Sequence, residues 1–231
     1  MEPTVASPPD AALSLPGVPP PLPYVLAALS GFLALAFEIA LTRLIVLIVT
    51  GGSVYGFAII LSAFLAGLAL GAWLLRLFPP PSPRAALAGF AAAQLAVWLF
   101  SLTTPFWDVL PGLLVRLWWN PLPFGLLSAL DFSIVLTLLL VLTTAFGYAL
   151  PALAAAVGGV RSDTVGRLFA ANTLGAVAGA PLTGFVLLEA MGINLTLQAL
   201  GAAALVTASA AAVLAFPRAW LAIVIPLPVL A

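Results

Sequence analysis

The feature that most constrains this chain is a series of apolar runs long enough to cross a lipid bilayer. A membrane-spanning helix needs about 20 predominantly apolar residues, and residues 24–215 provide such runs repeatedly. Only 6% of the 231 residues are charged and 64% are hydrophobic, whereas a soluble domain carries about 25% charged residues. The sequence therefore excludes a water-soluble globular domain and predicts an all-α polytopic membrane protein.

Six of these runs fit transmembrane helices, and segments rich in glycine or proline separate them. Glycine permits tight turns, and proline ends a helix because it lacks the backbone N–H. The expected spans are residues 24–49, 54–77, 85–103, 126–149, 166–189 and 194–215. Residues 105–124 contain four prolines and three tryptophans, a composition typical of an interfacial helix at headgroup depth.

The composition divides the chain into three parts. Residues 1–23 contain eight prolines and no apolar run, which predicts a disordered cytoplasmic tail rather than a signal peptide. Residues 24–215 form the expected six-helix transmembrane domain. Residues 216–231 are a short apolar stub, interpreted as a partial seventh helix or a membrane-associated segment.

The arginines favour a cytoplasmic N-terminus, since short loops that carry arginine stay in the cytoplasm. With this orientation the outer loops hold only Arg116, and the inner loops hold Arg76, Arg84, Arg161, Arg167 and Arg218.

The two halves of the domain also share a pattern. The second helix of each triplet carries Gly-x-x-x-Gly and follows a loop that contains glycine. Because three helices per unit would invert the second copy in the membrane, we interpret this pattern as a 3+3 inverted repeat.

Several kinds of chemistry are excluded by the residues that the chain lacks. It has no cysteine and no histidine, which removes disulfides, thiolate metal sites and histidine-based acid–base catalysis. The net charge is zero, so nothing indicates a nucleic-acid partner. We therefore expect no cofactor and no metal, and the lipid bilayer as the first partner.

Three charged residues fall within the expected spans, where each must face protein, water or a partner. Glu38 lies near the middle of the first span, Arg43 lies further toward its outer end, and Asp131 lies in the outer third of the fourth span. Because Arg43 and Asp131 reach similar depth, we expect them to form an ion pair. Glu38 would then be protonated or accept hydrogen bonds from Tyr55, Ser62, Asn172 or Thr173.

Two interpretations of Glu38 stay open. Intramembrane carboxylates mark ion and amine pathways, which favours a proton or cation relay. A structural charge pair, or a neutral acid that fixes helix packing, explains the same residue without a transport role. Gln94 and Gln198 also lie inside spans, and we expect both to form interhelical hydrogen bonds.

Small residues predict close helix packing. Gly67 and Gly71 on the second span, and Gly175 and Gly179 on the fifth, are both Gly-x-x-x-Gly pairs, and the latter face extends to Gly184. This spacing lets two helix backbones approach closely. The alternative is that Pro181 breaks the helix and frees carbonyl groups that line a cavity.

Two stretches resemble a known family. The first is Glu-x-x-x-x-Arg at Glu38 and Arg43, followed by Ala63 to Gly71; the second is Gly-Arg-Leu-Phe-Ala-Ala-Asn-Thr-Leu-Gly from Gly166. Both are similar to the bacterial membrane-integral spermidine-synthase-like proteins, also described as fused major-facilitator/spermidine synthases. The segment from Phe146 to Pro151 resembles the Gly-Ala-x-x-Pro element of the family.

The resemblance implies a multi-helix membrane region that, in full-length members, is joined to a soluble Rossmann-like aminopropyltransferase domain. These 231 residues contain no Gly-rich turn after a soluble strand and no acidic cluster, so we expect no aminopropyl transfer by this chain alone. It also implies a location in the bacterial inner membrane.

Three functions remain open from the sequence. The leading hypothesis is a membrane module that anchors a partner or handles a small cationic or amphiphilic substrate. The second is a major-facilitator-like half transporter for polyamines or other small substrates, which pairs with a second copy of itself. The third is aminopropyl transfer carried out with a soluble aminopropyltransferase-like subunit.

Overall fold

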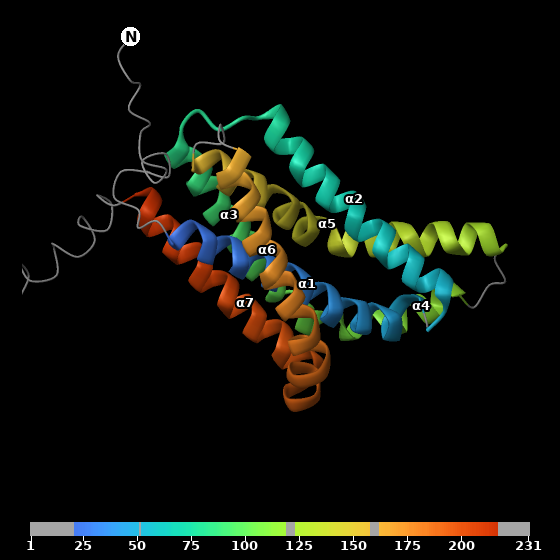
Figure 1. Cartoon of the computed structure of the whole chain (residues 1–231). Coiled ribbons are helices and arrows are strands. Elements are labelled where there is room, and N and C mark those ends of the chain that lie inside the picture. Colours follow the sequence, from blue (N-terminus) through green and yellow to red (C-terminus); the bar gives the residue numbers. More distant parts are fainter. Residues whose placement is uncertain (1–20, 51, 119–122, 158–161, 217–231) are drawn as a thin grey trace, which may run out of the picture.

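The computed structural model describes residues 21–50, 52–118, 123–157 and 162–216, and every regular element in them is a helix (Figure 1). The expected tail falls outside these residues except for its last three, and so does the stub apart from Phe216. The described part of the chain therefore corresponds to the expected transmembrane domain.

The first two helices are joined by a short link that contains glycine. Helix α1 spans Leu22–Ile45 and continues as a π-helical turn, η2, over Val46–Thr50. Helix α2 spans Val54–Leu77, and the Ser53 hydroxyl caps it by accepting a hydrogen bond of 3.0 Å from the backbone N–H of Gly56. A side-chain cap satisfies one of the N–H groups that a helix start leaves unpaired.

Helix α3 is followed by shorter helical elements, in the region where the sequence predicts a proline-rich interfacial segment. Helix α3 spans Pro83–Ser101, with Pro83 in its first turn and the Ser82 hydroxyl as its cap. A 3₁₀ helix, η3, follows over Thr104–Val109, and a short helix, α4, spans Leu110–Trp118. The proline-rich segment expected at the interface is thus two short helices.

Helix α5 is longer than the sequence predicts. It spans Phe124–Ala156 and contains Pro151 in its interior, whereas we expected the helix to end before this proline. Proline removes one intrahelical hydrogen bond, and in a membrane-spanning helix its neighbours can compensate for this loss. The prediction of a helix end at residue 149 is therefore wrong.

The last two helices are joined without a loop. Helix α6 spans Ser162–Leu182, a π-helical turn, η4, covers Thr183–Leu187, and helix α7 spans Leu188–Ala215. The direction of the chain changes at Gly192, which has φ 72° and ψ 174° inside α7. Figure 1 shows α6 and the main part of α7 as two arms of a hairpin. The turn at Gly192 thus lies between the expected spans 166–189 and 194–215.

Replacement of Gly192 by alanine is expected to destabilise the protein by about 1–3 kcal/mol, because only glycine adopts this backbone region without strain. Nothing lies within 4 Å of a Cβ added there, so the loss would come from the backbone alone. Thermal unfolding in detergent measures it. Gly112 also has open space around an added Cβ but has no positive φ, so Gly112→Ala should cause no such loss; equal effects of the two variants would contradict the prediction.

The described residues contain five helical runs that are long and apolar enough to cross a membrane. They are Leu22–Thr50, Val54–Leu77, Pro83–Val115, Phe124–Ala156 and Asp163–Ala215. Large apolar side chains lie on their outer surfaces, among them Phe185 at 77% exposure and Leu174 at 71%. An outer surface of this kind suits a lipid solvent.

The helices pack in a defined set of pairs. Helix α1 lies along α6, α2 lies along α5, and α3 packs on both α7 and α5. Phe37 of α1 and Phe146 of α5 meet in the centre, with ring centroids 6.1 Å apart. The core is therefore shared by α1, α3, α5 and α7, while α2 and α6 each pack on one main neighbour.

Candidate functional site

Glu38 lies within α1 and has no ionic or hydrogen-bonding partner among the described residues. Its side chain is half-buried. Neither Tyr55, Ser62, Asn172 nor Thr173 donates a hydrogen bond to it, so the expected set of donors is wrong. A carboxyl group that lies within an apolar helix and lacks a protein partner is suited to binding a cation or a proton.

The helix next to Glu38 is α6, which approaches α1 through its glycines. A Cβ at Gly175 would collide with the carbonyl oxygen of Ala28, and one at Gly179 would collide with that of Phe32. Both contacts join residues four apart on each helix, so α1 and α6 run parallel where they meet. On α1, a Cβ at Gly31 would collide with the backbone carbonyl of Asn172.

The same packing continues from Gly179 into the π-helical turn η4. Thr183 lies one turn beyond Gly179, is 0% exposed, and its hydroxyl has no hydrogen-bonding partner. Gly184, in the same turn, lies beside Ile39, the residue after Glu38. A π-helical turn interrupts the regular hydrogen bonds of a helix and often marks a functional position. The level of Glu38 in the bundle is therefore also the level of this irregular turn.

The sequence pattern does not by itself identify Thr183 as a functional candidate. It follows Pro181 and continues, at a spacing of four, the row that contains Gly175 and Gly179. This spacing could have identified it as a polar residue on a tightly packed helix face. The π-helical turn that surrounds it has no comparable signature in the sequence.

The predicted ion pair between Arg43 and Asp131 is wrong. Among the described residues the one ion pair joins Arg167 and Asp163, at 3.0 Å on an exposed surface. Arg43 is exposed, as is Leu47 one turn further, so its side chain faces outward from the bundle. Asp131 instead lies on the same face of α5 as the buried Val135, and its Oδ1 atom is buried without a partner. The two side chains therefore face different directions.

The remaining polar candidates do not join Glu38 in one cluster. Tyr55 is exposed in the first turn of α2, where its ring lies 5.3 Å from that of Phe124. Thr173 is exposed and donates its hydroxyl proton to the carbonyl oxygen of Phe169 in its own helix. Of the predicted polar residues, only Asn172 lies on the α6 face that packs on α1, together with Gly175 and Gly179.

Gly67 and Gly71 lie at a separate helix contact. A Cβ at Gly67 would collide with the Thr143 hydroxyl, and one at Gly71 would collide with the carbonyl oxygen of Thr144. These glycines therefore allow α2 to approach α5 closely, as Gly175 and Gly179 allow α6 to approach α1.

The acidic residues of the described segments are dispersed. No group of three or more acidic residues within these segments could hold a metal ion. Two carboxyl groups within the apolar helices, Glu38 and Asp131, lack a partner among the described residues. Glu38 is the one that lies beside the packed face of α6, and it is the candidate site.

Comparisons of the chain with models of protein families, with curated proteins and with solved structures find no match.

Proposed function

We propose that this chain is an integral membrane module, related to the spermidine-synthase-like membrane proteins, that binds a small cationic or amphiphilic substrate at Glu38. The observation that carries the proposal is the position of Glu38, within a membrane-crossing helix and without a partner among the described residues. A cationic substrate would supply the missing charge. The soluble aminopropyltransferase-like subunit remains the proposed protein partner.

The proposed arrangement has six crossings. A straight helix of the 53 residues from Asp163 to Ala215 would be about 80 Å long, more than twice the ~30 Å hydrocarbon core. Division at Gly192 turns this run into two crossings. The proposed location is the bacterial inner membrane with a cytoplasmic N-terminus, which the positions of the arginines favour.

The helix pairs support a 3+3 inverted repeat. In this repeat α1 corresponds to α5, α2 to α6, and α3 to α7. The α1–α6 contact then corresponds to the α5–α2 contact, and the α3–α7 contact corresponds to itself. In each of the first two pairs, a Gly-x-x-x-Gly helix packs in parallel on its neighbour. Inverted repeats are typical of secondary transporters.

This symmetry favours a second candidate function, a major-facilitator-like half transporter that works with a second copy of the chain. Glu38 would then be the coupling or amine-binding carboxylate. Proton-driven uptake of spermidine into reconstituted vesicles would support the transporter; binding without uptake would favour the module alone.

Glu38→Gln is expected to weaken spermidine binding at least about tenfold, because a hydrogen bond to a charged group contributes about 1.5–3 kcal/mol. Isothermal titration of the purified full chain in lipid nanodiscs measures the affinity. Glu189 is exposed at the end of a helix, so Glu189→Gln serves as the control and should bind as the unmodified protein does. Absence of binding to the unmodified protein, or equal affinity of both variants, would refute the proposal.

A further inference from the structure

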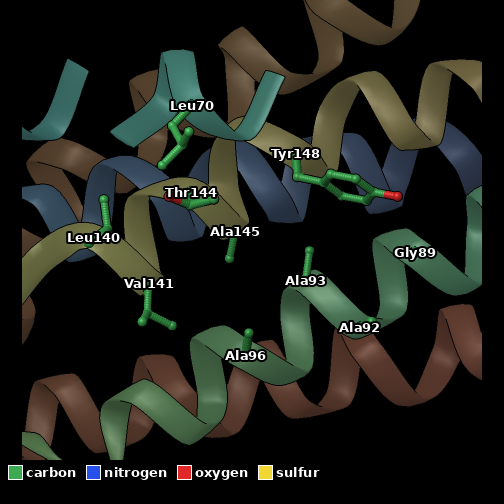
Figure 2. Close-up of a pocket in the computed structure, with 10 residues that line it drawn as sticks. All are labelled: Leu70, Gly89, Ala92, Ala93, Ala96, Leu140, Val141, Thr144, Ala145 and Tyr148. Atoms are coloured by element: carbon green, nitrogen blue, oxygen red, sulfur yellow. The ribbon is translucent and has the colours of Figure 1, made fainter. Parts of the chain in front are cut away.

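A groove of about 500 Å³ lies between α2 and α3 and has α5 as its floor (Figure 2). Both α2 and α3 pack on α5, but they do not pack along each other. Leu70 contributes to the α2 wall, and the α3 wall runs from Gly89 to Ala96, where every lining residue is glycine or alanine. The small side chains of α3 leave the space open.

The lining of the groove selects an apolar occupant. Among the lining residues only Thr144 and Tyr148 carry polar groups, and the Thr144 hydroxyl is itself buried. The Tyr148 ring extends from α5 toward α3, and its hydroxyl would lie 2.7 Å from a Cβ placed on Gly89. From Gly89 to Ala96 the wall is about 10 Å long at 1.5 Å per residue. A narrow apolar chain that lies along the helices fits this shape.

The two helices that flank the groove each carry an arginine near the same end of the bundle. Arg76 lies in the last turn of α2, six residues or about 9 Å beyond Leu70, and Arg84 lies in the first turn of α3, five residues or about 7.5 Å before Gly89. Both arginines are exposed, and neither forms an ion pair with a described residue. The sequence has no acidic residue between 70 and 96.

We propose that this groove binds an anionic phospholipid, with one acyl chain between α2 and α3 and the phosphate held by Arg76 and Arg84. Guanidinium groups bind phosphate oxygens in a bidentate manner, and basic sites beside transmembrane helices bind anionic headgroups. The acyl chain would fill the space between α2 and α3, which do not pack along each other. This site is separate from Glu38, so it stands or fails independently of the proposed substrate.

Native mass spectrometry of the full chain in detergent tests the headgroup contacts. Dioleoylphosphatidylglycerol should bind more tightly than dioleoylphosphatidylcholine, and the double variant Arg76→Gln with Arg84→Gln should lose this preference, by about five-fold for each arginine. The control variant Arg43→Gln changes an exposed arginine on a different helix, α1, and should keep the preference for the anionic lipid. Glycerophosphoglycerol, which has the headgroup but no acyl chains, should not displace the lipid.

Variants that fill the groove test the acyl-chain contacts. Ala96→Phe should reduce the occupancy by both lipids, whereas Ala202→Phe, at an exposed position on α7 outside the groove, should not. Leu140→Trp fills the same groove from α5 and replaces Ala96→Phe if that variant does not fold. The proposal is overturned if the unmodified protein shows no preference for the anionic lipid, or if the double arginine variant keeps that preference. It is also overturned if the headgroup alone displaces the lipid, or if the variants with a filled groove bind lipid as Ala202→Phe does.

Discussion

Gly175→Leu is expected to prevent α1 and α6 from packing and to destabilise the protein by more than about 3 kcal/mol. Overpacking of a core costs about 1–3 kcal/mol, and more when the obstacle cannot move. Here the obstacle is the backbone carbonyl of Ala28, which a Cβ at Gly175 would already strike. The measurement is the fraction of monodisperse protein that remains after heating in detergent.

The same helix offers a matched control. Gly166 has no heavy atom within 4 Å of an added Cβ, so Gly166→Ala creates no collision. It should instead stabilise α6 slightly, since alanine in a helix is favoured over glycine by about 1 kcal/mol. Loss of the fold in both variants, or in neither, would show that close approach of α6 to α1 is not what Gly175 provides.

The second large effect is expected in the opposite direction. Gln94 on α3 is 0% exposed, and neither its Nε2 nor its Oε1 atom has a hydrogen-bonding partner. A buried polar group without a partner costs about 1–3 kcal/mol. Gln94→Met has a similar shape and removes the polar amide, so we expect thermal unfolding to shift to higher temperature by an amount that corresponds to this energy.

Gln198 on α7 provides the comparison for Gln94. Its Nε2 atom donates hydrogen bonds to the carbonyl oxygen of Ser101 at 2.6 Å and to the Thr104 hydroxyl at 3.3 Å. Gln198→Met should therefore destabilise the protein by about 1 kcal/mol, a magnitude typical of hydrogen bonds between membrane helices. A loss of stability in both methionine variants would mean that the amide of Gln94 has a partner in the folded protein.

The sequence predicts some helices closely and others poorly, for local reasons. The bounds of α2, Val54–Leu77, coincide with the expected 54–77, since Ser53 caps one end and three successive prolines follow the other. The end of α5 is not predicted correctly, because a single proline such as Pro151 does not by itself end a helix. Pro151 lies in a helix that packs on α2 and α3, and tertiary packing can retain a helix past a proline.

The candidate site was predictable in its residues but not in its contacts. The apolar residues around Glu38 identify it as a charged group whose insertion into the membrane costs free energy. The spacing of Gly175 and Gly179 indicates a helix face that packs closely on another helix. Which helix meets that face depends on the three-dimensional arrangement, and so does the direction in which Arg43 extends. The interhelical hydrogen bond predicted for Gln198 is confirmed, whereas the one predicted for Gln94 is wrong.

The pairing of α1 with α6 has a consequence for the order of events during synthesis. The contact between Ala28 and Gly175 joins residues 147 positions apart, while the contact between Gly71 and Thr144 joins residues 73 apart. At about 5–20 residues per second, a ribosome reaches Gly175 roughly 7–30 s after Ala28. The face of α1 that packs on α6 therefore stays without its partner helix for this time, in the bilayer or in contact with the insertion machinery. Helices α2 and α5 can already associate during this interval.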